Sequence, residues 1–205
     1  MSWARSLNTL SVEGPEQRRA QLNDHMDQLL ASGLNCYQCW GRCCTYHANS
    51  MHVTFLEVID IFLYLNDKKL WNFRLEKKLK ATVEDFRLDY DLYLASQKNF
   101  RRTYTCPFFE AGSKGCGLPR EHKPYGCLGF NPTQKNVKDG EGCGSNKELL
   151  ELHHKSVEND NLEIQAALEQ LKTINKSFAD VFYWTKKDLP RALLDISQFH
   201  PFEDH

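Results

Sequence analysis

The feature that most constrains this chain is the stretch from Cys36 to Cys44, which holds four of its eight cysteines. Cys36, Cys39 and Cys43 are spaced so that a turn followed by a helix could aim their side chains at a common point. A C-x2-C pair in an intracellular chain is typical of a thiolate metal site or a redox pair, and the additional C-x3-C step makes a plain redox pair less consistent with the sequence. The stretch therefore predicts a metal centre.

The other four cysteines lie in a second region, between Thr103 and Gly144, that is rich in Gly and Pro. This composition predicts irregular loop, and an irregular segment of about forty residues inside a compact domain needs something to hold it in place. Bonds from four thiolates to metal would do so. The candidate metal ligands are Cys36, Cys39, Cys43, Cys44, Cys106, Cys116, Cys127 and Cys143.

The composition of the whole chain limits the classes of partner. With 205 residues, 41% of them hydrophobic, the chain can bury a core as one domain, and its net charge of -1 gives no general attraction to nucleic acid or anionic membranes. The sequence shows neither the apolar segment of a secretory signal nor a membrane span. We therefore expect a cytoplasmic protein with reduced thiols, no nucleic-acid partner and no membrane partner. The alternative is an exported protein with four disulfides.

The hydrophobic periodicity predicts a mainly α fold, a single helical domain in which two cysteine-rich metal-binding loops are packed together. Capping boxes at Thr54–Glu57 and Ser145–Glu148 predict two helix starts, the first opening a central buried helix to about Asn66. A helical region is expected over 68–97, a break over 158–161 and a short last helix from about Asp188, with no convincing sheet. The expected organisation is one domain, 1–205, with an N-terminal helix at 14–33, a cysteine-cluster core at 36–143 and C-terminal helices at 145–205.

The ligand type does not determine which metal is bound, because four thiolates can coordinate either a tetrahedral zinc ion or an iron–sulfur cluster. The wide gaps in the second group disfavour a simple zinc ribbon, and the compact first group with Cys106-Pro107 favours iron. Since adjacent side chains point in different directions, Cys43 and Cys44 could serve different centres.

Residues around the cysteines have both functional and ordinary interpretations. Aromatic side chains could form a shell of low polarity around a centre or pack as plain core, and Trp40 is the most suggestive of them. His47, His52 and His122 could supplement the thiolates, and Arg42, Arg120 and Lys123 could offset their charge, although solvated surface positions are the more common outcome. For Glu57 we favour a capping role and for Asp60 a solvent-facing one. The flanking aromatic residues are Tyr37, Trp40, Tyr46, Tyr104, Phe108, Phe109, Tyr125 and Phe130.

The two cysteine groups resemble the YkgJ-type family of bacterial cysteine-cluster proteins, which are described as zinc- or iron-chelating. The resemblance rests on Cys36-x2-Cys39-x3-Cys43-Cys44 and on Cys106-Pro107-Phe108-Phe109 followed by Cys116, Lys123-Pro124-Tyr125-Gly126-Cys127 and Cys143. Lys123 stands where the family usually has Arg, Leu128 where Arg often follows the cysteine, and Pro119 near a common aromatic position. Because a lysine lacks the fork of an arginine, we carry over no anion-binding role for these positions. The resemblance implies metal chelation, first by iron or an iron–sulfur cluster and next by zinc.

The leading hypothesis is a metal-binding cysteine-cluster protein that holds an iron–sulfur centre or iron, with a redox or cluster-dependent role. A zinc-stabilised module for binding a protein partner and a metal-dependent modifying enzyme are the alternatives. No phosphate loop, Ser-His-Asp order or paired carboxylate motif supplies an independent reaction, so the catalytic residues are left unassigned.

Overall fold

The computed structural model describes residues 13–35, 39–90, 101–110, 116–138, 141–145, 147–172 and 186–198. In the range 147–172, side chains are described only as far as residue 166. These residues are mainly helical, as the sequence predicts. The main helices are α2 (Pro15–Ala31), α3 (Phe55–Asp67), α4 (Phe73–Asp85), α5 (Tyr125–Leu128), α6 (Lys147–Lys172) and α8 (Leu189–Ser197). None of the helices formed by the described residues combines the length and apolar character needed to cross a bilayer.

The short elements surround the cysteines. They comprise the 3-10 helices η1 (Arg42–Cys44) and η2 (Arg120–His122), and the two-residue strands β1 (His52–Val53), β2 (Asn131–Pro132), β3 (Cys143–Gly144) and β4 (Lys187–Asp188). β1 pairs antiparallel with β4, and β2 pairs antiparallel with β3. We expected no sheet from the sequence, and segments this short carry too few residues to show an alternating pattern.

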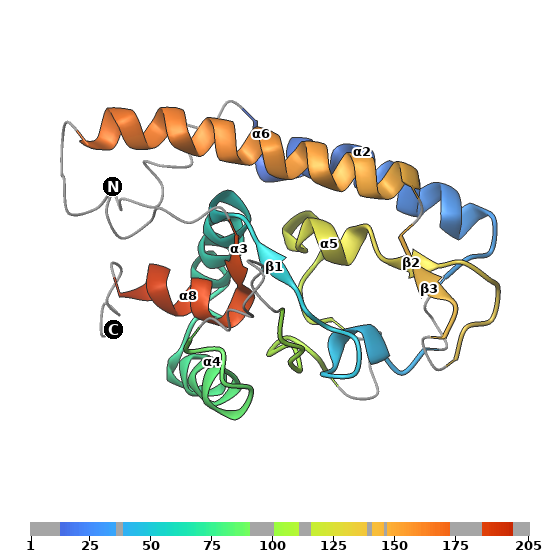
Figure 1. Cartoon of the computed structure of the whole chain (residues 1–205), viewed down its shortest axis with the longest axis horizontal. Helices are drawn as coiled ribbons and strands as arrows, with labels where there is room; N and C mark the ends of the chain where they lie inside the picture. The colour runs from blue at the N-terminus through green and yellow to red at the C-terminus, as the bar shows by residue number, and fades with distance from the viewer. Residues whose placement is uncertain are drawn as a thin grey trace, which may run out of the picture.

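The central helix is α3, as predicted. Thr54 and Glu57 form its capping box, with the Thr54 hydroxyl accepting from the Glu57 N–H at 3.2 Å and Glu57 accepting from the Thr54 N–H at 2.6 Å. Its side chains from Phe55 to Phe62 are all buried, and the helix packs against α6 and α8. In Figure 1, α3, α4 and α8 form one group, over which the long helix α6 extends.

A second, smaller core lies between α2, α5 and α6. It contains Leu22, Tyr125, Leu128, Leu149 and Val157, and α2 lies alongside α6 (Figure 1). The predicted N-terminal helix is present, and Leu22 is its fully buried apolar side chain, whereas Met26, Leu29 and Leu30 are only half-buried.

Several expected boundaries are wrong. The chain turns at Lys69, whose φ is 56°, before α4 starts, and α4 ends at Asp85, so no continuous helix begins at 68. Positions 91–97 lie outside the described residues. α6 continues without the break expected at 158–161, because Asp160 points into the interior and binds Thr54 and Tyr125. The helix from Leu189 is confirmed, and the tail beyond Gln198 lies outside the described residues.

Buried charge joins α2 to α3. Asp60 pairs with Arg18 at 2.5 Å and with Arg19 at 2.7 Å, and all three side chains are almost fully buried. The solvent-facing position expected for Asp60 is therefore wrong, while the capping role expected for Glu57 is confirmed. Glu57 also accepts a hydrogen bond from the Tyr125 N–H at 2.6 Å, which fixes the first residue of α5, the helix that contains Cys127.

Candidate metal centre

The first cysteine segment is not one helix. Gly41 has a φ of 86° in the left-handed region, and only Arg42–Cys44 form a single 3-10 turn after it. The expected helical alignment of the first cysteines is therefore wrong from Cys39 onward, and Cys36 lies outside the described residues. Cys39 is buried, and its sulfur accepts a hydrogen bond from the Gly41 N–H at 3.4 Å.

Backbone hydrogen bonds join the two cysteine segments. The Cys106 N–H donates to the Cys44 carbonyl oxygen at 2.8 Å, and the Tyr104 N–H donates to the Asn49 carbonyl oxygen at 2.9 Å. The Trp40 N–H donates to the Lys138 carbonyl oxygen at 3.3 Å, which connects the first segment to the end of the second. Cysteines far apart in the sequence are thereby brought to one part of the fold.

Every cysteine that the structure describes lines one cavity of about 570 Å³. The cavity also receives side chains from α2, α5 and α6, so helices and loops together form its walls. Cys39, Cys43, Cys44, Cys106, Cys116 and Cys127 are free thiols, which leaves their sulfur atoms available as ligands. The described cysteines that line the cavity are Cys39, Cys43, Cys44, Cys106, Cys116, Cys127 and Cys143.

The neighbouring thiols Cys43 and Cys44 are hydrogen-bonded to each other, so they do not diverge as we expected from their adjacency. The hydrogen bond from Cys44 lowers the pKa of Cys43 to about 7 against the opposing effect of burial, and the charge of Lys123 adds to the lowering. The same bond and burial raise the pKa of Cys44. Cys43 is therefore more readily ionised than Cys44, and the thiolate is the form that binds metal.

Cys106 and Cys127 lie deeper. Burial raises the pKa of Cys106 to about 12, and the nearby Cys116 and Cys43 add to this effect. Burial also raises the pKa of Cys127 well above its usual value, with further contributions from Cys116, Cys106 and Cys43. These thiols are close enough to oppose each other's ionisation. A bound cation would reverse this balance, because its positive charge stabilises each thiolate.

The thiols do not form a ready-made site for a single ion. Within the described ranges, no group of three or more His, Cys, Asp or Glu side chains is arranged to hold a metal ion. A tetrahedral zinc ion with Zn–S bonds of ~2.3 Å requires four sulfurs within roughly 4 Å of one another. The donor atoms suit a soft metal by their chemistry.

The histidines proposed as extra ligands have different surroundings. His52 lines the cysteine cavity, but its Nε2 faces Asp188 at 3.0 Å. His47 contacts the rings of Trp40 and Tyr46. His122 stacks on Tyr64 with a centroid distance of 4.4 Å and lines a different cavity.

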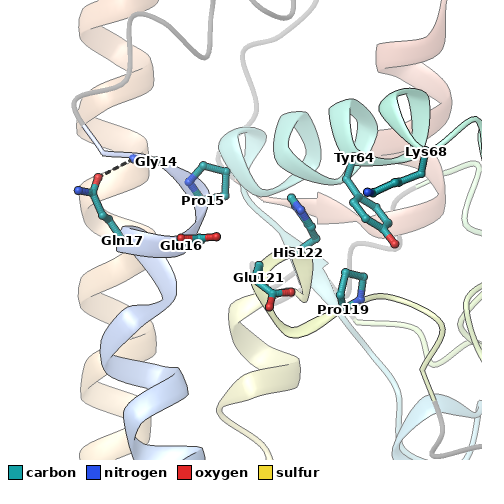
Figure 2. A pocket seen from close by; sticks show the side chains of 9 residues that line it. All are labelled: Gly14, Pro15, Glu16, Gln17, Tyr64, Lys68, Pro119, Glu121 and His122. Carbon is teal, nitrogen blue, oxygen red and sulfur yellow. Dashed lines mark hydrogen bonds between the residues drawn. The ribbon is translucent and has the colours of Figure 1, made fainter.

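That other cavity has a volume of about 650 Å³, and no cysteine is among its described lining residues. Figure 2 shows it between the start of α2, the end of α3 and η2, with Glu16, Tyr64 and His122 around it. The Nδ1 atom of His122 is buried and has no hydrogen-bond partner among the described residues. Its described lining thus lacks the thiols that are concentrated in the cysteine cavity.

The predicted aromatic shell is only partly present. Phe130 lines the cavity, whereas Trp40 is 47% exposed and Tyr46 is exposed as well. Tyr104 and Tyr125 are fully buried and support the cysteine segments from behind. Tyr37 lies outside the described residues.

The three cations predicted to offset the charge of the thiolates also differ in their partners. Arg42 pairs with Glu141 at 3.6 Å, and Arg120 pairs with Asp27. Of these three cations, Lys123 favours the thiolates of Cys43 and Cys127. Lys78, which the sequence did not single out, favours the thiolate of Cys106. Sequence reasoning did not identify Arg101, His153 and Lys186, which also line the cavity but are distant from the cysteines in the sequence.

Comparisons with known proteins identify no relative. A scan against protein-family models finds no match, and neither the curated proteins nor the solved structures contain a significant match to the chain.

Proposed function

We propose that this is a metal-binding cysteine-cluster protein whose thiolates hold an iron–sulfur centre or iron. The observation that carries the proposal is the convergence of all described cysteines on one cavity, from segments as distant in sequence as Cys39 and Cys143. Burial makes each of these thiols hard to ionise. A bound cation would compensate the charge of their thiolates, so the gathering of thiols around one cavity is explained if the cavity holds a metal. The cysteine pattern of the YkgJ-type family points in the same direction.

We favour an iron–sulfur centre over mononuclear zinc, because the wide gaps in the second cysteine group disfavour a simple zinc ribbon and the compact first group with Cys106-Pro107 favours iron. A single zinc ion draws four sulfurs close together, whereas a cluster places several irons between its ligands and so accepts thiolates that are farther apart. Cys43, Cys44, Cys106, Cys116 and Cys127 lie close enough together to interact electrostatically. When bound, such a centre would supply one-electron redox chemistry, and the buried thiolates would set its potential.

The test is anaerobic purification followed by elemental analysis and visible absorption spectroscopy. The proposal predicts a coloured protein with stoichiometric iron, acid-labile sulfide for a cluster, and thiolate-to-iron absorption bands. A colourless protein with stoichiometric zinc would contradict the iron assignment and support the zinc-stabilised module.

The ligand assignment has a separate test. Cys127→Ala should lower the metal content, because this buried thiol lies beside Cys106 and Cys116. Ala48→Ser is a matched control, since Ala48 lines the same cavity and supplies no sulfur. Undiminished metal in Cys127→Ala would remove Cys127 from the ligands.

A further inference from the structure

The cysteine cavity has a one-sided distribution of charge. Four of its described lining residues are Arg or Lys, namely Arg101, Arg120, Lys123 and Lys186, and none is Asp or Glu. The whole chain carries 27 acidic and 26 basic residues, so composition does not account for this difference. A hollow lined by charge of one sign concentrates ligands of the opposite sign.

Two of these four cations are already engaged. Arg120 pairs with Asp27, and Lys123 acts on the thiols of Cys43 and Cys127. Arg101 and Lys186, by contrast, form no ion pair with a carboxylate in the part of the chain that the structure describes. They are therefore the groups available to a ligand.

Arg101 and Lys186 lie near His153 of α6, and we call these three side chains the basic wall. Burial and the charges of Lys186, His154 and Arg101 lower the pKa of His153 to about 4. Burial and the charge of Arg101 likewise lower the pKa of Lys186. These directions agree with basic groups that are close together and lack a counter-charge.

The nearest opposing charge is already committed. Glu57 interacts electrostatically with Lys186, but its two oxygens accept hydrogen bonds from the backbone N–H groups of Thr54 and Tyr125, at 2.6 Å each. Glu57 is also fully buried beneath α5 and thus cannot move out to neutralise the basic wall. Among the described lining residues, no carboxylate therefore faces Arg101 and Lys186.

Apolar side chains complete the cavity. α2 contributes Met26, α6 contributes Leu150, and Phe130 follows α5. Leu150 and Phe130 remain 43% and 37% exposed, so a ligand could still cover part of them. A volume of about 570 Å³ lies within the range of small-molecule sites, roughly 300–1,000 Å³.

We propose that the cavity binds a small amphiphilic organic anion, whose carboxylate or phosphate headgroup lies against Arg101 and Lys186 and whose apolar body lies along Met26, Phe130 and Leu150. This ligand would be the substrate of the thiolate centre. In placing the anion beside a metal, the inference rests on the proposed function. The anion-binding surface itself is formed by residues outside the cysteine motif.

The test is calorimetric titration of the full chain, purified anaerobically with its metal, using hexanoate, hexyl phosphate, acetate and hexanol. Hexanoate or hexyl phosphate should bind at least about tenfold more tightly than acetate, because the longer chain buries apolar surface. Hexanol should bind weakly, since it lacks the anionic headgroup. The tighter of the two six-carbon anions identifies the preferred headgroup.

Matched variants locate the headgroup. Arg101→Gln and Lys186→Gln should each weaken binding of that anion by about tenfold, the effect of one charged hydrogen bond. Arg74→Gln and Lys77→Gln remove the same charges from exposed positions on α4 and should leave binding unchanged. Equal losses in both pairs of variants, or no binding of either six-carbon anion by the wild type, would overturn the inference.

Metal analysis of every sample separates the two proposals. Metal-loaded wild type that binds neither six-carbon anion contradicts the anion site and leaves the metal centre standing. Metal-free protein that binds the anion, with loss in Arg101→Gln and Lys186→Gln, supports the anion site and contradicts the metal centre.

Discussion

Asp60 is the residue on which the junction of α2 and α3 depends. Its carboxylate balances the buried guanidinium groups of Arg18 and Arg19. Asp60→Asn would remove the carboxylate that pairs with the buried guanidinium groups of Arg19 and Arg18, and we expect a loss of about 3–5 kcal/mol in the free energy of unfolding. Urea denaturation followed by circular dichroism measures this change.

The matched control is Asp24→Asn at an exposed position of α2, the helix that carries Arg18 and Arg19. An exposed substitution of this kind should change stability by less than about 0.5 kcal/mol. If both variants unfold at the same urea concentration, the buried ion pairs do not have the role assigned to them.

Asp160 makes stability depend on pH. Burial, with a contribution from Glu57, raises the pKa of Asp160 from 3.8 to about 7. The folded protein therefore holds this proton more tightly than the unfolded chain, so the stabilising effect is complete below pH 4 and is lost as the pH rises through 7. Each unit of pKa difference corresponds to about 1.4 kcal/mol.

Comparison of the wild type with Asp160→Asn isolates this effect, because the amide does not ionise. Between pH 5 and pH 8 the free energy of unfolding of the wild type should fall relative to that of the variant, measured by urea denaturation at each pH. Parallel pH profiles for the two proteins would show that Asp160 ionises equally easily in both states.

Both carboxylates show a limit of sequence reasoning at the scale of the residue. Asp60 was expected to face solvent and Asp160 to lie in a break, because charged residues are rarely buried without partners. The partners are Arg18, Arg19, Thr54 and Tyr125, which come from other elements. A local pattern carries no information about such distant partners.

At the scale of the secondary-structure elements, α3 and α4 both begin with a side-chain N-cap, which is buried in α3 and exposed in α4. The Asn72 side chain accepts a hydrogen bond from the Leu75 N–H at 3.0 Å in an exposed position. The Thr54 hydroxyl accepts from Glu57 and also donates to the buried Asp160 at 2.5 Å. Asn72→Ala should cost about 1 kcal/mol, and Thr54→Ala should cost about 1–3 kcal/mol more, because it leaves a buried carboxylate oxygen without its donor.

Thermal or urea unfolding of both variants tests this order of stability. The difference should shrink when Asp160→Asn is already present, since the two side chains interact directly. Equal destabilisation by the two caps would contradict the link from α3 to α6.

Helix positions were more predictable than helix ends. The apolar run in α3 and the Leu-Pro start of α8 were sufficient to place both helices. The stops at Lys69 and Arg87 depend on left-handed backbone conformations of residues other than glycine, with φ of 56° and 51°. Residue type gives little warning of such a conformation, so the helical region expected over 68–97 was too long.

At the scale of the whole molecule, the cysteine groups predicted a shared location but not its form. The convergence of Cys43, Cys44, Cys106, Cys116 and Cys127 agrees with the expectation that the two groups lie close together. The basic wall was not predictable, because Arg101 and Lys186 are brought together only by the tertiary fold. Our central claim is that those converging thiols hold a metal centre.

X-ray absorption spectroscopy at the metal edge of the anaerobically purified full chain tests that claim most directly. We predict an iron edge with a shell of sulfur neighbours at about 2.3 Å, and an additional iron neighbour if the centre is a cluster. Cys127→Ala should lose part of the sulfur shell or the metal itself. Stoichiometric metal surrounded only by nitrogen and oxygen, or no bound metal in the wild type, would contradict a thiolate-held centre in this cavity.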